Sequence, residues 1–385
     1  MIGMSAVIFI PDDTAKTGYP QPLMLQSVMG APLLAWLANA LFDSGVGRFF
    51  LVCHDRYVEA ARACLPAEAE VMTTMDSDPA DLLHVFLSTA EDAEHTITVV
   101  TGPAVYLPQL APQAAGRFPR VYGVSREELM QALDEHFSFA RFLLDNGSPM
   151  NEEQAMYSVA SPAELPEIAG LLQRNRLLAL ARTGVEIYDA SSCYVEPSVR
   201  VAPGARLLPG TMLRGKTVIG EEAVIGPWSV IDDSVIGARA VVNASQVRDS
   251  RVGQDAVVGP YASVRGGCEL GRSVRAGSFV ELKNARLGEN TQVPHLAYLG
   301  DTEAGANCNF GCGVTTANFD RVQKHETVVG EGAFIGCNTA LIAPLQVGSG
   351  AYIGAGSTIT EDVPAQALGI ARQSNKKEWA AKHKK

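Results

Sequence analysis

VEPSVRVAPGARLLPGTMLRGKTVIGEEAVIGPWSVI, residues 195–231, carries an aliphatic residue at every sixth position. The seven positions are Val195, Val201, Leu207, Leu213, Ile219, Ile225 and Ile231. A period of six matches neither the period of about 3.6 of an α-helix nor the period of about 2 of a β-strand. It is typical of a parallel β-helix, in which each short strand stacks on the equivalent strand of the next coil. We therefore expect these side chains to pack along the axis, with glycine or another small residue at the tight corners.

Two further runs keep the same period, from Val252 to Leu282 and from Val329 to Ile359. The period is interrupted between Phe310 and Val329 by a polar stretch, GCGVTTANFDRVQKHETV. Insertions of this kind in repeat proteins often form the binding surface. We expect this one to project from one face of the β-helix.

The first 160 or so residues have the alternation of strands and helices that is typical of an α/β domain. The expected strands are Ser5 to Ile10, Arg48 to Cys53 and Thr96 to Thr101, and the expected helices are Pro32 to Ser44 and Tyr57 to Cys64. A helix from Ser161 to Thr183 opens with a Ser-x-x-Glu capping box. The predicted organisation is an α/β domain over 1–160, a linker helix over 161–189, a β-helix over 190–368 and a basic tail over 369–385.

The composition argues against several classes of function. The chain has 385 residues and a formal net charge of −11, so a broad attraction for nucleic acid or for an anionic membrane is not expected. The longest apolar stretch, Ala31 to Phe42, is too short to span a bilayer, and the first residues read as a strand rather than a signal peptide. The seven cysteines form no CxxC pair, and we expect free thiols in a cytoplasmic protein.

The segment from Gly259 to Lys324 places side chains that an aliphatic core does not need. They combine cations, an imidazole and hydrogen-bonding groups: Arg265, Lys283, His295, Tyr298, Asn309 and Lys324. Such a set suits a phosphorylated substrate that bears an amine, because guanidinium and ammonium groups bind phosphate and an imidazole accepts a proton near neutral pH.

The same segment resembles the acetyltransferase domain of the GlmU-type proteins, which are bifunctional N-acetylglucosamine-1-phosphate uridyltransferases and glucosamine-1-phosphate acetyltransferases. The motifs that carry the resemblance are Arg265-x-Gly, Phe279-Val-Glu-x-Lys, His295-Leu-x-Tyr-x-Gly-Asp, Asn309-x-Gly-x-Gly and the terminal Arg372. The pattern covers residues 259–372 without a gap and residues 190–258 more loosely. The resemblance implies a left-handed parallel β-helix and acetyl transfer to glucosamine 1-phosphate, a step that supplies UDP-N-acetylglucosamine.

Roles for single residues follow from this resemblance. It implies that His295 is the general base, that Arg265 and Lys283 bind the sugar phosphate, and that Tyr298 and Asn309 contact the sugar. Lys324 matches a lysine that reaches a neighbouring subunit's site, so a homotrimer is implied. The positions expected to bind acetyl-CoA are Cys312, Asn318, Phe319, Cys337, Ala355 and Arg372.

The chain departs from the family pattern at five of the matched positions. Phe319 stands where Tyr is common, Cys312 and Cys337 replace Ala and Ser, Asn284 replaces a second Lys, and Pro294 replaces Gly before His295. These changes bear on substrate preference and rate more than on the type of reaction.

The first domain resembles a shortened nucleotidyltransferase whose phosphate-handling residues are missing. The loop PDDTAKTGYPQ carries Asp12 and Asp13, which would repel a triphosphate, and Leu23 stands where a lysine is expected. Pro103 occupies the place of the aspartate expected to hold Mg²⁺ and offers no ligand oxygen, so Mg²⁺ is not expected as a cofactor. We predict no uridyltransferase activity.

Two other functions remain open at this stage. Both domains could have lost their chemistry, leaving a trimeric regulatory protein or one that binds sugar nucleotides. Alternatively, acetyl transfer could be kept with another amino-sugar phosphate or a nucleotide-linked amino sugar as the acceptor.

Overall fold

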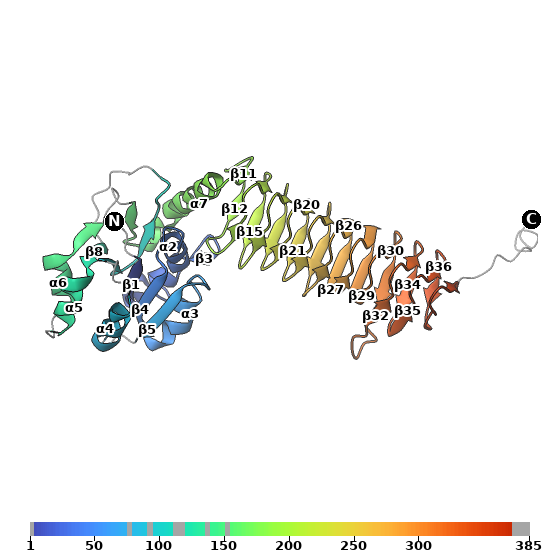
Figure 1. Ribbon diagram of the computed structural model, residues 1–385, viewed down its shortest axis with the longest axis horizontal. Helices are drawn as coiled ribbons and strands as arrows, with labels where there is room; N and C mark the ends of the chain where they lie inside the picture. Colours follow the sequence, from blue (N-terminus) through green and yellow to red (C-terminus); the bar gives the residue numbers. More distant parts are fainter. Residues whose placement is uncertain are drawn as a thin grey trace, which may run out of the picture. The chain divides into compact units, whose positions relative to one another are not determined.

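The structure is a computed structural model that describes residues 4–74, 79–90, 95–110, 120–134, 139–150 and 155–371. The chain forms two compact units. The first comprises residues 1–180 with 195–198, and the second comprises residues 181–194 with 199–385. Figure 1 shows an α/β fold in the first unit and a stack of coils in the second. None of the described helices is long and apolar enough to cross a membrane.

The first unit is built on a six-stranded sheet with the strand order β5-β4-β1-β6-β8-β9. These strands are β5 (Glu70–Thr74), β4 (Arg48–Cys53), β1 (Ser5–Ile10), β6 (Thr96–Val100), β8 (Val121–Ser125) and β9 (Ser148–Met150). The pairs among β5, β4, β1 and β6 are parallel, whereas β8 is antiparallel to β6 and to β9. Two small antiparallel pairs accompany the sheet, β7 (Ala104–Tyr106) with β10 (Met156–Ser158) and β2 (Ser27–Val28) with β3 (Ala31–Pro32).

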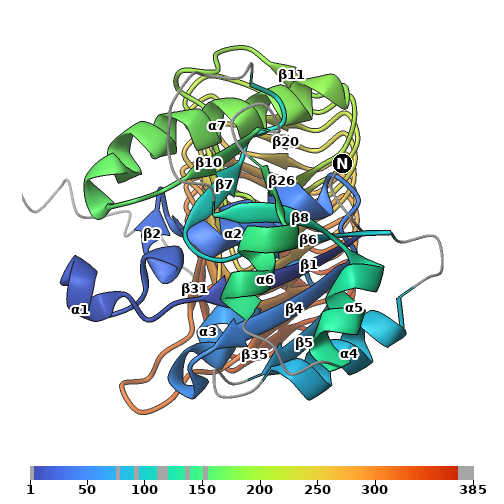
Figure 2. The same cartoon turned by 90° about the vertical axis from the view of Figure 1, so that its left-hand side faces the viewer.

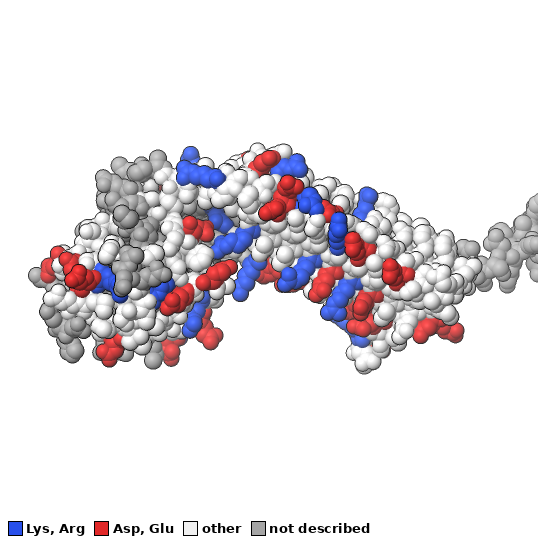
Figure 3. All heavy atoms as spheres, in the orientation of Figure 1, with Lys and Arg blue, Asp and Glu red and all other residues white. Residues whose placement is uncertain are grey.

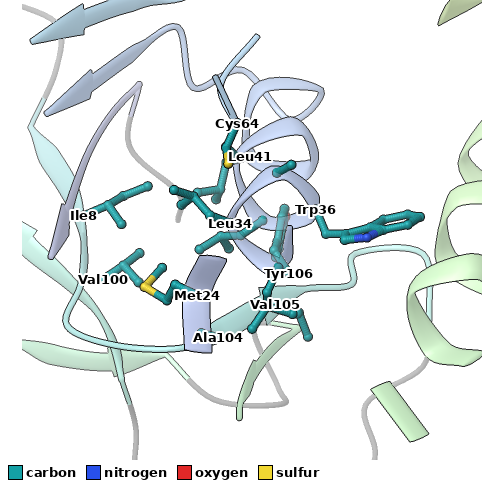
Figure 4. Packing of buried hydrophobic residues seen from close by; sticks show 14 of the residues in the cluster. Ile8, Met24, Leu34, Trp36, Leu41, Cys64, Val100, Ala104, Val105 and Tyr106 are labelled. Carbon is teal, nitrogen blue, oxygen red and sulfur yellow. The ribbon is translucent and has the colours of Figure 1, made fainter. Parts of the chain in front are cut away.

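Helices cover both faces of this sheet. Alternate side chains of β1 point to opposite faces and therefore enter two separate cores. Ile8 packs in a core with α2 (Leu33–Phe42) and α3 (Val58–Arg62), as Leu34 does in Figure 4. Val7 packs in the other core with α4 (Ala80–Ser88), α5 (Arg126–Asp134) and α6 (Phe139–Asn146), which lie together in Figure 2. A short helix, α1 (Thr14–Thr17), follows β1. The strands and helices predicted up to residue 101 are therefore confirmed.

The helix predicted from Ser161 is confirmed as α7 (Leu165–Arg182), preceded by a 3₁₀ turn at Pro162–Glu164. The predicted capping box is not formed, because neither of its two bonds is present. The Glu164 carboxylate accepts a hydrogen bond from the Ala160 amide at 3.3 Å, but Ser161 makes no side-chain capping bond. Pro162 at the first position offers no N–H group, which reduces the number of donors that need a cap.

The second unit is a parallel β-helix. One face is a single ladder: β11 (Glu186–Ile187), β14 (Arg206–Leu207), β17 (Val224–Ile225), β20 (Val241–Val242), β23 (Val257–Val258), β26 (Arg275–Ser278), β28 (Gln292–His295), β30 (Asn309–Phe310), β33 (Phe334–Ile335), β36 (Tyr352–Ile353) and β38 (Leu368–Gly369). The other two faces share one bent sheet: β12 (Tyr194–Val195), β13 (Arg200–Val201), β15 (Met212–Arg214), β16 (Val218–Ile219), β18 (Val230–Asp232), β19 (Val235–Ile236), β21 (Gln246–Arg248), β22 (Arg251–Val252), β24 (Ser263–Arg265), β25 (Glu269–Leu270), β27 (Glu281–Leu287), β29 (Tyr298–Ala304), β31 (Thr315–Ala317), β32 (Thr327–Val329), β34 (Ala340–Ile342), β35 (Leu345–Val347) and β37 (Thr358–Ile359).

The residues of the six-residue repeat form the core of this β-helix. Leu207, Ile225, Val258 and Ile335 are fully buried, and Val201 near the first coils is only partly so. The fold class predicted from the repeat, an α/β domain followed by a hexapeptide β-helix, is thus confirmed.

Many corners carry glycine in a left-handed conformation, as expected, for example Gly204 and Gly332, but four corners carry large hydrophobic side chains. Trp228, Tyr261, Phe279 and Leu296 occupy corners with φ between 43° and 61°, and their side chains are more than half exposed. Each corner amide donates a hydrogen bond to the preceding coil, as Leu296 N does to Ser278 O at 2.9 Å. These bonds offset the cost of a left-handed conformation in residues other than glycine.

Candidate active site

His295 is the last residue of β28, and its side chain is exposed. Val293 of the same strand points into the core and is fully buried, so the chain beyond it turns outward at the corner. The coil below comes unusually close, because a Cβ on Gly277 would lie 2.0 Å from the carbonyl oxygen of Pro294. Only glycine allows this approach. The imidazole therefore lies exposed at a corner whose backbone packs on Gly277, and it is not buried among aliphatic side chains.

Three cationic side chains converge on the neighbouring face. Arg265 at the end of β24 lies directly opposite Lys283 in β27. Lys324 from the projecting loop contacts Lys283, and this contact and the positive charge of Lys324, with the charge of Arg265, hold the pKa of Lys283 below its usual value. Gathering like charges is unfavourable without an anion between them, which makes this cluster suited to a phosphate.

Arg265 also has a partner within the protein. Its guanidinium pairs with Glu281, with 3.1 Å between Nε and Oε1, and both side chains are about 40% exposed (43% and 40%). An exposed ion pair of this kind stabilises a protein by about 0–1 kcal/mol, so an incoming phosphate can compete for the guanidinium. Figure 3 shows that basic and acidic side chains are interspersed along the β-helix, so the attraction for an anion is local.

The loop that carries Lys324 is closed by Asp320. The Asp320 carboxylate accepts hydrogen bonds from the amides of Val322 and Gln323, each at 2.8 Å, and contacts His325 Nε2 at 2.7 Å. These contacts hold the pKa of Asp320 far below its usual range. Phe319 and Lys324 pair across the loop, which leaves the coil as predicted from the lost period (Figure 1).

Tyr298 and Asn318 meet above a glycine. A Cβ on Gly300 would lie 2.4 Å from the Tyr298 hydroxyl and 2.7 Å from Asn318 Nδ2. Gly300 lies opposite Lys283 in the β27 and β29 register, so this pair of polar groups adjoins the cation cluster. Asn318, which is expected to bind acetyl-CoA, is mostly buried and lies beside Tyr298.

Asp301 is a polar residue to which the sequence motifs assigned no role. The residue is 7% exposed, and its carboxylate accepts a hydrogen bond from Asn284 Nδ2 at 2.7 Å and another from Asn318 Nδ2. The Gly-Asp pair that ends the His295 motif was a signal for this position, but its burial and partners depend on how successive coils align.

Three of the positions expected to bind acetyl-CoA stack on successive coils. The amide of Asn338 donates to Cys312 O and that of Gly356 to Cys337 O, each at 2.7 Å, which places Cys312, Cys337 and Ala355 in one column. The amide of Gly313 donates to Leu296 O at 3.0 Å, so the same column begins at His295. The side chains of Cys312, Cys337 and Ala355 are small, and a Cβ on Gly311 or Gly336 would lie within 2.6 Å of backbone of the next coil. An extended thiol-bearing arm could therefore lie close to this wall.

The remaining predicted residues fall outside these groups. Asn309 begins β30 and lies on the face of that ladder, opposite Gln292 and Phe334. Phe319 is 61% exposed on the projecting loop. Arg372 lies outside the described residues.

In the first unit, the residues at the positions expected to bind a nucleoside triphosphate make contacts within the protein. Asp12 pairs with Arg56 and accepts a hydrogen bond from Thr14 Oγ1 at 2.7 Å, and Asp13 accepts one from the Leu23 amide at 2.9 Å. Leu23 itself is a core residue, 1% exposed. These side chains serve the local fold.

Comparison with known proteins bears on the β-helix most directly. The family described as bacterial transferase hexapeptide (six repeats) matches residues 326–361. The bifunctional protein GlmU of Clostridium perfringens is 42% identical over 240 residues, which cover 62% of this chain and 53% of that protein. The bifunctional protein GlmU of Caldicellulosiruptor saccharolyticus is 48% identical over 203 residues, 52% of this chain and 44% of that protein. The chain thus spans about half the length of these relatives.

Similarity among solved structures is weaker. The inositol-1-phosphate CTP transferase from T. maritima covers 46% of this chain and 97% of its own, with 12% identity and a TM-score of 0.35, too low to carry a functional argument. The sequence relatives, together with the hexapeptide match, confirm the resemblance of this chain to GlmU-type proteins over more than half of its length.

Proposed function

We propose that this chain transfers the acetyl group of acetyl-CoA to the amine of glucosamine 1-phosphate, giving N-acetylglucosamine 1-phosphate and free CoA. The observation that carries the proposal is the convergence of Arg265, Lys283 and Lys324 on a wall that also presents an exposed His295. The likeness to GlmU-type relatives supports the same substrate class.

His295 acts as the general base in this mechanism. Only an unprotonated amine attacks a thioester, and an imidazole has a pKa near neutrality that lets it accept the proton. The amine nitrogen bonds to the acetyl carbon, the carbon–sulfur bond breaks, and the imidazolium returns its proton to the departing CoA thiolate. The three cations bind the phosphate, and Tyr298 and Asn318 orient the sugar so that the amine meets the carbonyl carbon.

Acetyl-CoA fits the column that runs from His295 to Ala355. The small side chains at Cys312, Cys337 and Ala355 leave the wall accessible to an extended pantetheine arm, whose thioester end would meet His295. Arg372 is assigned to the CoA phosphates by resemblance alone. Neither cysteine is needed as a nucleophile, because the transfer is direct.

We also propose that the protein acts as a homotrimer. Hexapeptide β-helices present flat faces that pack around a threefold axis, and the resemblance to GlmU-type proteins supports a site shared between subunits. Within one chain Lys324 already lies beside Lys283, so a neighbouring subunit would complete the sugar site rather than supply the phosphate-binding cations.

An acceptor panel tests this function. Purified protein is given acetyl-CoA with glucosamine 1-phosphate, galactosamine 1-phosphate, a nucleotide-linked glucosamine or unphosphorylated glucosamine, and released thiol is measured. We expect turnover with glucosamine 1-phosphate above the others. Turnover only with another acceptor would change the substrate, and no turnover with any acceptor would favour a non-catalytic binding protein.

Replacement of the base sharpens the test. The substitution His295→Ala should lower kcat about 10²- to 10⁴-fold, the usual contribution of a general base. His54→Ala is the matched control, because His54 is an exposed histidine that caps a short helix in the first unit. An unchanged rate in His295→Ala would remove this residue from the mechanism.

A further inference from the structure

A nearly buried carboxylate, that of Asp301, lies between the cation cluster and the Tyr298 and Asn318 pair. It is 7% exposed and begins the bend between two faces of β29, with φ at 47°. Asn284 and Asn318 donate their side-chain amides to its two oxygens. A buried charge persists only when it is paired or well hydrogen-bonded, and Asp301 accepts hydrogen bonds from two side-chain amides.

The carboxylate fixes which way both amides point. An ionised carboxylate only accepts hydrogen bonds, so each asparagine must turn its Nδ2 group toward Asp301 and its Oδ1 away. For Asn318 this orientation keeps the amide beside the Tyr298 hydroxyl above Gly300. Asp301 therefore fixes the orientation of the Asn318 amide that lies beside Tyr298.

The same carboxylate acts on the phosphate-binding cations. Lys324 and Arg265 both lower the pKa of Lys283, and Asp301 raises it. Glu281, the other acidic group of this region, is engaged with Arg265. Because Gly300 lies opposite Lys283 in the strand register, its neighbour Asp301 is placed where a negative charge opposes the surrounding positive charges.

Asn284, which stands where the family pattern commonly has a lysine, affects how the charge of Asp301 acts on Lys283. A lysine there, as is common in the family pattern, would place a second cation against Asp301. Asn284 instead binds Asp301 as a neutral donor at 2.7 Å, so the negative charge of Asp301 stays available to Lys283.

We propose that Asp301 is a positioning residue that couples the two halves of the substrate site: it orients Asn318 beside Tyr298 and holds Lys283 as a charged ligand for the sugar phosphate. This inference rests on the proposed function, because it assigns a phosphorylated sugar to the site. It adds a residue that touches neither the phosphate nor the amine.

Asp301→Asn tests the coupling with little change of shape. Loss of the negative charge lowers the pKa of Lys283, so binding of glucosamine 1-phosphate, measured by calorimetry between pH 6 and 10, should begin to weaken at a lower pH than in the wild type. Disturbance of Asn318 should also reduce kcat roughly 10- to 100-fold, the size expected for a misplaced reacting group. Protonation of the substrate's own amine and phosphate is the same for both proteins and cancels in the comparison.

Two further variants make the result decisive. Asn284→Lys leaves Asp301 in place but neutralises its effect on Lys283, so it should shift the pH dependence of binding in the same direction. Asp249→Asn is the matched control, because Asp249 occupies an equivalent corner with φ at 47° on an earlier coil, and it should leave both binding and kcat unchanged.

The outcomes separate this inference from the proposed function. If the wild type does not bind glucosamine 1-phosphate, the proposed function fails. If the wild type binds it and Asp301→Asn has the same pH dependence and the same kcat, the role of Asp301 is overturned. A lowered melting temperature with unchanged pH dependence would also overturn it, because that result shows only a structural role.

Discussion

The two units of this chain bury their cores in different ways. In the first unit large side chains from distant segments, among them Phe49 and Phe86, meet on the two faces of one sheet. In the β-helix each strand contributes an aliphatic residue that packs on its neighbours in adjacent coils, as Ile225 and Val258 do. Solenoids of this kind gain stability mainly from contacts between successive repeats.

This difference governs where chemistry can be placed. In the first unit, Leu23 at an expected ligand position has become core, and Asp12 and Asp13 are bound within their own loop. In the β-helix only the inward residue of each strand is committed to packing. Its outward positions, such as Lys283 and Tyr298, are available for a substrate, and the fixed register brings them together.

The largest expected contrast is between two reactions of the same preparation. The protein should release CoA thiol with glucosamine 1-phosphate but form no UDP-N-acetylglucosamine from UTP, Mg²⁺ and N-acetylglucosamine 1-phosphate. The reason is that Leu23 and Pro103 cannot bind a triphosphate or a metal ion. Chromatography of the nucleotide products measures this, and UTP-dependent formation of the nucleotide sugar would contradict it.

A core substitution in the first unit should separate stability from acetyl transfer. Phe49 is fully buried, and Phe49→Ala should lower the free energy of unfolding of that unit by about 3–5 kcal/mol. Because the proposed site lies wholly on β-helix residues, kcat for acetyl transfer should stay at the wild-type value at temperatures where the unit remains folded. Calorimetric melting and thiol release measure the two effects, and a parallel loss of kcat would show that the units are coupled.

The β-helix could be predicted from the sequence because its aliphatic residues recur at every sixth position. Sequence reasoning also selected Arg265, Lys283 and Lys324 as cations, and the structure brings these three together. It could not find Asp301, because a carboxylate in a repeat reads as solvent-exposed until the alignment of coils shows that two amides cover it. The bulky corner residues were missed for a similar reason, since their backbone conformation depends on hydrogen bonds to the preceding coil.

A smaller effect is expected from filling the space above Gly300. In Gly300→Ala the new methyl group would displace the Tyr298 hydroxyl and the Asn318 amide, both flexible ends of side chains. We expect a roughly 10- to 100-fold fall in kcat and a lowered melting temperature, because the Asn318 amide also bonds the buried Asp301. Gly170→Ala in α7 is the control, because no atom lies within 4 Å of the added carbon, and alanine should stabilise that helix slightly. Equal kcat in both variants would show that the Tyr298 and Asn318 pair does not orient the substrate.

The smallest expected effect concerns the loop that carries Lys324. The pKa of Asp320 is depressed in the folded protein by its bonds to the Gln323 amide, His325 and the Val322 amide. A depressed carboxyl pKa stabilises the loop above the ordinary carboxyl value, and this stabilisation is lost only as the pH falls through the depressed value. Asp320→Asn should therefore raise KM for the sugar phosphate roughly two- to five-fold, a change that fits the loss of modest hydrogen bonds, and the ratio to wild type should be the same at pH 5 and pH 8.

Asp362→Asn is the matched control for this loop, since Asp362 accepts a single amide hydrogen bond, from Gln346 at 2.8 Å, in another exposed turn of the β-helix. It should leave KM unchanged. If the effect of Asp320→Asn disappears at pH 5, the Asp320 carboxylate already titrates in the ordinary range and does not hold the loop. If KM is unchanged at both pH values, Lys324 reaches the phosphate without the hydrogen bonds of Asp320. Substrate binding would then depend on the stacked coils and not on the conformation of this loop.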